Sequence, residues 1–311
     1  MFELDNHTPR SGSADMEREG TTDENPIHLQ GDAAEEFRDL LWSLYALPQE
    51  IAMATAESDV IRLSNIARMA HKYQYITTET WALGILLAHF SSKSASSIET
   101  PTLVQITEVA VLCEDKSLLD AVRLRWKSLI GKREDLAVAI NVLGRLGIRD
   151  LEGLAYYGML FQGRARWDSD PGLTRDQRIR LLSGYYNLTK ASEALTQNPP
   201  EFAHLPPCSD NEACKEDWAS CWKTFTKIEN GPGLFSQIVV HDKMDLMGRL
   251  MMAVSLMTAF SEAVEGGNQA SFSDLRLEFV WSDCVSAALE ATIRMSKDNQ
   301  ENLMRFFEDV A

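Results

Sequence analysis

Cysteine is scarce in this sequence, and the few cysteines are too scattered to form a disulfide framework. Five cysteines occur in 311 residues, namely Cys113, Cys208, Cys214, Cys221 and Cys284. Small extracellular domains that depend on disulfides carry far more cysteines per residue. We therefore expect a protein of a reducing compartment, the cytoplasm or the nucleus.

The sequence also lacks a long apolar run and an excess of positive charge. No segment approaches the roughly 20 apolar residues that cross a bilayer, and no basic start followed by an apolar stretch opens the chain. Acidic residues outnumber basic ones by 46 to 30, for a formal net charge of −16. Such a charge repels both phosphate backbones and anionic lipids, so we expect no nucleic-acid partner and no membrane.

Half of the excess negative charge lies near the N-terminus. Between Met1 and Glu36 there are ten acidic residues and two basic ones, and residues 1–24 offer few apolar side chains. A segment of this composition cannot offset the entropy that ordering costs. We expect residues 1–24 to be a disordered acidic tail, with an acidic interaction motif as the alternative.

Most of the remaining chain has the apolar spacing of α-helices. Ile27 and Leu29 alternate with polar neighbours and predict one short strand. After them, apolar residues recur three and four positions apart, which is the period of a helix with one buried face. One such helix, predicted to end at Gly131, carries this stripe: Leu118, Leu119, Val122, Trp126, Leu129 and Ile130.

Two residue pairs have the spacing of a capping box and predict helix starts. They are Thr102 with Gln105 and Thr174 with Gln177. In a capping box the hydroxyl and the amide, three residues apart, satisfy each other's unpaired backbone N–H groups. Further helices are predicted at 177–195, 211–228, 242–264 and twice within 279–310.

A serine-rich and a proline-rich segment divide the chain into domains. Ser91–Pro101 is polar, and Thr196–Asp210 carries four prolines in two pairs, which end helices and stiffen connections. We expect a mainly α fold class with three regions after the tail, at 25–92, 93–200 and 201–311.

No catalytic signature is present in the sequence. It contains no G-x-S-x-G, no phosphate-binding glycine loop after a strand and no H-E-x-x-H. We expect no enzymatic activity and no cofactor.

Four side chains in and just after the proline-rich segment offer metal binding or thiol oxidation as the alternative chemistry. They are His204, Cys208, Cys214 and Cys221, but their spacing lacks the paired cysteines of zinc knuckles. Cys214 and Cys221 share one helical stripe with tryptophans, which indicates a core face. They lie about 10 Å apart on that helix, too far for a disulfide, whereas Cys208 can approach Cys214.

Several segments follow one another in a characteristic order: a strand, an aromatic-rich helix, a helix that ends in Lys72, Tyr73 and Gln74, and a further amphipathic helix. The stretches are EGTTDENPIHLQGDAAEEFRDLLWSLYALPQEI, LSNIARMAHKYQYITTETWAL, TLVQITEVAVLCED, LLDAVRLRWKSLIG and LTRDQRIRLLSGYYNLTK. In this order they resemble the BTB/POZ domain-containing proteins expanded in mushroom-forming fungi. The resemblance covers most of the chain from about Gly20.

The resemblance implies a small α+β BTB module followed by helices similar to the BACK region. BTB domains bind proteins. They self-associate, and in some families they also bind a cullin-type ubiquitin ligase. A full module begins with a strand hairpin and a helix pair, and this chain is expected to lack that N-terminal half. The implied core or interaction residues are Phe37, Leu41, Trp42, Tyr45, Tyr73 and Trp81.

We therefore expect a nonenzymatic protein–protein interaction module, with substrate adaptor of a cullin-type ubiquitin ligase as its most specific form. Its expected partners are proteins, including a second copy of the chain or a cullin. The alternative is a metal- or redox-responsive helical domain that uses His204, Cys208, Cys214 and Cys221.

Overall fold

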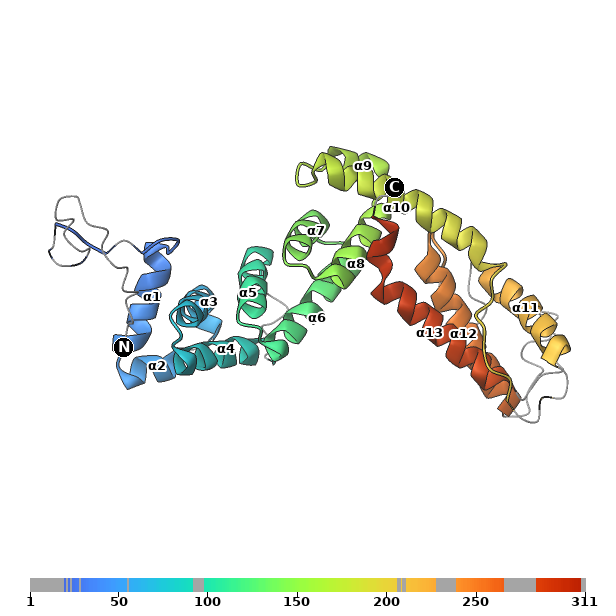
Figure 1. Cartoon of the computed structure of the whole chain (residues 1–311), viewed down its shortest axis with the longest axis horizontal. Helices are drawn as coiled ribbons and strands as arrows, with labels where there is room; N and C mark the ends of the chain where they lie inside the picture. The colour runs from blue at the N-terminus through green and yellow to red at the C-terminus, as the bar shows by residue number, and fades with distance from the viewer. Residues whose placement is uncertain are drawn as a thin grey trace, which may run out of the picture. The chain divides into compact units, whose positions relative to one another are not determined.

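A computed structural model shows a mainly helical protein, which confirms the predicted mainly α class (Figure 1). The structure describes residues 20, 22, 24–27, 29–54, 56–91, 98–205, 208, 211–227, 239–265 and 284–308. Within these residues there are thirteen α-helices and one 3-10 helix. The predicted disordered tail, residues 1–24, lies almost entirely outside the described residues.

The strand predicted at Ile27 and Leu29 is wrong. Both residues have irregular backbone and exposed side chains. The nearest feature is an isolated bridge between Thr22 and Asn25, and no strand is available as a partner among the described residues. A single extended segment without such a partner leaves its backbone hydrogen bonds unmade. The described residues thus contain helices alone where the resemblance implies an α+β module.

The chain divides into two compact units, Met1–Ala95 and Ser96–Ala311. In the first unit, α3 packs against both α1 and α4. Gln74, with a φ of 60°, ends α3, and the Tyr75 N–H donates back to the Ala70 carbonyl at 2.8 Å. This bond satisfies a carbonyl of the last turn and reverses the chain. The helices of the unit are α1 (Ala34–Tyr45), α2 (Pro48–Met53), α3 (Ala56–Lys72) and α4 (Ile76–Ser91).

The second unit begins with a pair of packed helices, α5 (Thr100–Leu112) and α6 (Lys116–Lys132). Asp115 starts α6, because its carboxylate accepts the Leu118 N–H at 2.7 Å. Across the pair, the fully buried Trp126 donates its indole N–H to the Thr107 hydroxyl at 2.9 Å. The predicted stripe from Leu118 to Ile130 is buried in this helix apart from the partly buried Leu119.

The helix-end predictions have mixed outcomes. The Thr174 capping box is confirmed: its N–H donates to Gln177 Oε1 at 2.8 Å, and the Gln177 N–H donates to the Thr174 hydroxyl at 3.2 Å. The Thr102 box is wrong, because Pro101, favoured in a first turn, lets α5 begin at Thr100. Gly131 does not end α6 either, since Arg133 takes the left-handed conformation.

Helix α8 is central to the next part of the unit, where it contacts α6, α7, α10 and a short C-terminal 3-10 helix, η5. A Cβ at Gly153 would lie 2.6 Å from the Met304 nitrogen, so the glycine allows η5 to approach α8 closely. Behind it, the ring of Phe307 stacks on Tyr156 with centroids 5.1 Å apart. The bounds are α7 (Leu136–Arg145), α8 (Arg149–Leu160), α9 (Arg164–Ser169), α10 (Arg175–Leu195) and η5 (Leu303–Phe306).

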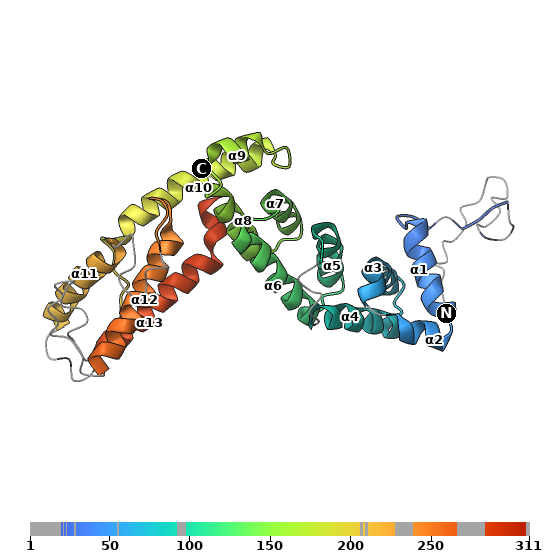
Figure 2. The ribbon, with the colours of Figure 1, turned by 180° about the vertical axis from the view of Figure 1, so that it is seen from behind.

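Three long helices complete the unit, with α12 packed between α11 and α13 (Figure 2). Asp245 fixes the start of α12 to α8, because its carboxylate accepts both the Gly248 N–H at 2.8 Å and the Tyr157 hydroxyl at 2.7 Å. Among the described helices, none combines the length and apolar character that crossing a membrane requires. The bounds are α11 (Asn211–Lys227), α12 (Leu246–Glu265) and α13 (Val285–Glu301).

Candidate metal centre

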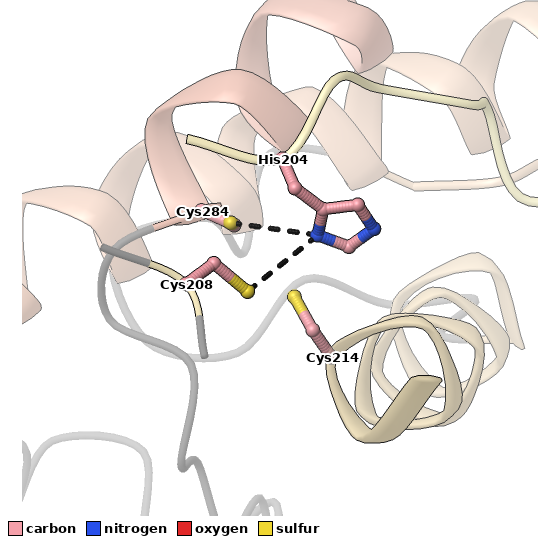
Figure 3. A group of neighbouring side chains, drawn as sticks. All are labelled: His204, Cys208, Cys214 and Cys284. Carbon is pink, nitrogen blue, oxygen red and sulfur yellow. Dashed lines mark hydrogen bonds between the residues drawn. The ribbon is translucent and has the colours of Figure 1, made fainter. Parts of the chain in front are cut away.

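One cluster of side chains in the second unit brings together one imidazole and three thiols (Figure 3). His204 and Cys208 lie in the segment that joins α10 to α11. Cys214 lies in the first turns of α11, and Cys284 is the residue directly before α13. Three parts of the chain that are distant in sequence therefore meet at one point.

The donor atoms are close enough to share one small ion. One ligand atom from each of the four residues lies within 4.8 Å of all the others. The His204 Nδ1 is 3.7 Å from the Cys208 Sγ and 3.7 Å from the Cys284 Sγ. Cys214 and Cys284 are buried, while His204 and Cys208 are partly buried. Two of the four donor side chains are thus shielded from solvent, and two remain partly accessible.

Aromatic contacts hold His204 in place from the outer side. The His204 ring packs on Phe202 with centroids 5.1 Å apart, and Phe202 packs edge-on against Trp218 at 6.1 Å. Trp218 and Trp222 tie this segment to α11, because their indole N–H groups donate to the carbonyls of Pro200 and Leu195. The chain before His204 is thereby fixed along α11.

The surroundings of the Cys214 thiol favour its protonated form. Burial raises the pKa of Cys214 to about 12, and the neighbouring Cys284 and Cys208 thiols raise it further in the same direction. A cation at the centre of the cluster reverses this preference, because it attracts the thiolate form.

The sequence favours no metal site and offers four residues only as candidates of the alternative hypothesis, and the structure changes one member of that candidate set. His204, Cys208 and Cys214 come together as that set requires, but Cys221 does not join them. Cys221 lies two helical turns further along α11 and is 1% exposed, and burial raises its pKa strongly. Its place is taken by Cys284, which the sequence analysis missed. No local spacing connects Cys284 with the other three residues, so only the packing of α13 reveals it.

The six predicted interaction residues divide into two groups. Phe37 and Tyr73 face inward, where they pack against the buried cluster of Leu40, Met69 and Ala70. Their rings meet edge to face with centroids 6.1 Å apart. These two aromatic side chains belong to the interior of the first unit.

The other predicted interaction residues lie nearer the surface. Tyr45 is 83% exposed and Leu41 is 39% exposed. Trp42 is partly buried, with the Arg62 guanidinium 4.9 Å above its ring, and Trp81 is partly buried on α4. Leu41 and Tyr45 are therefore the members of the set that can reach another molecule.

Comparison with known proteins adds no further guide, since no protein-family model, curated protein or solved structure matches the chain. The donor atoms of the centre therefore indicate its chemistry. One imidazole nitrogen and three cysteine sulfurs are donors that structural zinc sites use.

Proposed function

We propose that this chain is a nonenzymatic protein–protein interaction module. The observation that carries the proposal is an exposed apolar surface along α1 and at Leu47, the second residue after it. We name this surface the α1 apolar face; it consists of Leu41, Leu44, Tyr45 and Leu47. Leu40, which directly precedes Leu41 on α1, is buried in the interior of the unit.

The composition of the α1 apolar face supports protein binding. Leu41, Leu44 and Tyr45 are spaced three and four apart, so they lie on one side of the helix. Tyrosine is enriched at protein interfaces, because it offers a large apolar ring and one hydrogen-bonding group. The partner that fits is a protein with an apolar surface of its own, which includes a second copy of this chain.

A finer form of the proposal is a substrate adaptor for a cullin-type ubiquitin ligase that works in the cytoplasm or nucleus. The sequence resemblance to BTB/POZ proteins supports the adaptor role. The compartment is supported by the state of the five cysteines, all in the described part of the chain, which form no disulfide.

Paired charge substitutions test the α1 apolar face. We expect Leu41→Glu/Tyr45→Glu to weaken partner binding at least tenfold, because each buried unpaired carboxylate costs more than about 1.4 kcal/mol. The matched control is Leu182→Glu/Tyr186→Glu on α10, which has the same residue types, the same spacing and exposed side chains.

Partners are crosslinked to the full chain in a fungal lysate, and their enrichment is measured. Sedimentation of the purified chain, alone and with a purified cullin, measures self-association and cullin binding. The proposal requires that a defined partner, a second copy or the cullin is lost with the α1 pair and kept with the α10 pair. Equal retention by both pairs, or recovery of chaperones only, would refute it.

A second candidate function is a metal- or redox-responsive helical domain, which the cluster of His204, Cys208, Cys214 and Cys284 favours. In the redox form, two thiols give up their hydrogens and form an S–S bond, while hydrogen peroxide is reduced to two waters. The sulfur atoms lie within 4.8 Å of one another, so side-chain rotation can bring two of them to bonding distance.

A further inference from the structure

We infer that the cluster is a structural zinc site whose ligands are His204, Cys208, Cys214 and Cys284. The inference deepens the second candidate function and rests on it, since it names the ion and the four ligands. It does not depend on the interaction proposal, which concerns the other unit.

The distances between the donor atoms are close to those around a tetrahedral zinc ion. A tetrahedral zinc with Zn–S bonds of about 2.3 Å and a Zn–N bond of about 2.0–2.1 Å separates two sulfurs by about 3.8 Å and a sulfur from a nitrogen by about 3.6 Å. The two measured separations from the His204 Nδ1 are both 3.7 Å. All separations between the donor atoms are within 4.8 Å, so a contraction of at most about 1 Å completes the tetrahedron.

The types of donor atom favour zinc over other ions. Thiolate ligands select soft or borderline ions such as Zn²⁺ and Cu⁺, whereas Mg²⁺ and Ca²⁺ require oxygen donors. No carboxylate belongs to this group of donor atoms within the described residues. A mixed set of three sulfurs and one imidazole nitrogen, arranged around one centre, is characteristic of zinc.

The number of protein ligands indicates a structural rather than a catalytic ion. Four protein ligands fill a tetrahedral site, whereas catalytic zinc keeps one position for water or substrate. A cavity of about 810 Å³ opens beside His204, and none of the three cysteines lines it. The donor atoms of the cysteines and His204 converge on one point outside this cavity, which is the arrangement of a structural site (Figure 3).

The ligands also show what the ion holds together. Cys214 belongs to α11, Cys284 precedes α13, and both of these helices pack against α12. His204 and Cys208 come from the connection between α10 and α11. Zinc at this point fastens the start of α13 and that connection to α11, so its binding energy contributes to the stability of the C-terminal helices.

Metal binding by purified full-length variants tests the site. Each protein is loaded with Zn²⁺ or Co²⁺ alone and dialysed, and then bound metal, the visible Co²⁺ spectrum and thermal unfolding are measured. We expect one zinc per wild-type chain, the intense visible absorption of tetrahedral Co²⁺ with a thiolate charge-transfer band, and a higher Tm with metal.

Cys214 and Cys221 lie on the same helix, α11, and therefore give a matched comparison. Substitution of a residue that only orients a metal ligand typically weakens metal binding by up to about 100-fold. Cys214→Ala and Cys284→Ala remove ligands themselves, so we expect each to weaken zinc binding by more than about 100-fold. Cys221→Ala is expected to keep full zinc binding and the zinc-dependent rise in Tm. Circular dichroism of the metal-free variants separates loss of a ligand from loss of the fold.

Every outcome decides between the proposals. Loss of zinc with Cys221→Ala but not with Cys284→Ala would overturn the ligand set. A wild-type chain that binds neither metal, yet forms a disulfide with hydrogen peroxide, refutes the zinc site and leaves the redox function standing. Freely titrating thiols with neither metal nor disulfide formation refute both.

Discussion

At the scale of single residues, Asp32 links the segment before α1 to the end of α3. Its carboxylate accepts hydrogen bonds from the Lys72 ammonium and from the Tyr73 hydroxyl, the latter at 2.5 Å. Lys72 also donates to the Gln30 carbonyl at 3.0 Å. The hydrogen bond from Lys72, followed by the one from Tyr73, lowers the pKa of Asp32 below its ordinary value.

The lowered pKa predicts a pH-dependent contribution to the stability of the first unit. A carboxyl whose folded pKa is depressed stabilises the fold above its unfolded pKa, near 3.8, and loses that effect as the pH falls through the folded value. We expect Asp32→Asn to speed hydrogen exchange of the α3 amides at pH 7 and to match the wild type once Asp32 is protonated. A difference that persists unchanged at the lowest pH would contradict this.

The candidate metal centre shows which residues a sequence can place. Cys208 and Cys214 are six residues apart and His204 is four residues before Cys208, so the chain connection alone keeps these three close. Cys221 was included because it lies nearby in sequence, but helical geometry directs it to the interior beside Trp222. Cys284 is seventy residues from Cys214, and only the packing of the last helices brings it near.

At the scale of elements, the C-terminal 3-10 helix is fixed by one aromatic residue that follows it. Phe307 is fully buried and stacks on Tyr156 of α8. A Cβ at Gly184 of α10 would lie 2.2 Å from the Phe307 ring, so this glycine makes room for it. The Asn187 amide adds a hydrogen bond to the Phe306 carbonyl at 3.0 Å.

This packing predicts a large difference between two neighbouring phenylalanines. We expect Phe307→Ala to lower the free energy of unfolding by about 3–5 kcal/mol, because it leaves a cavity among α8, α10 and η5. The control is Phe306→Ala, whose ring is only partly buried beneath the Arg305 guanidinium and should cost about 1 kcal/mol or less. Guanidinium denaturation checks both, and similar losses would show that Phe307 does not anchor η5.

Apolar spacing predicts the positions of the helices correctly. Helix ends are mispredicted where a neighbouring residue determines the backbone conformation. The helix at 177–195 and the helix from 211 follow from apolar spacing and are found as α10 and α11. The Thr102 box failed because Pro101 already favours an earlier start. The end of α6 was misplaced because Arg133 adopts a positive φ that its residue type does not suggest.

At the scale of the whole molecule, the two units differ in how completely they cover their apolar surface. The second unit buries large aromatic side chains, among them Trp126, Trp222 and Phe260. The first unit has a smaller core around α3 and leaves Tyr45, Leu47 and Met53 exposed. A small domain with uncovered apolar side chains has little stability of its own.

This contrast predicts different behaviour of the separated units. We expect residues 96–311, with zinc present, to unfold cooperatively on heating, and residues 1–95 to be insoluble or to lose helix gradually without a sharp transition. Circular dichroism and calorimetry of the two fragments measure this. A sharp, reversible transition from the shorter fragment would show that its own core suffices.

The claim that joins these scales is that one zinc ion, bound by His204, Cys208, Cys214 and Cys284, fastens the C-terminal helices. X-ray absorption at the zinc edge of the purified full-length chain tests it most directly. We predict three sulfur neighbours at about 2.3 Å and one nitrogen neighbour at about 2.0–2.1 Å. A first coordination shell of oxygen and nitrogen alone, or a chain that retains no zinc, would contradict it.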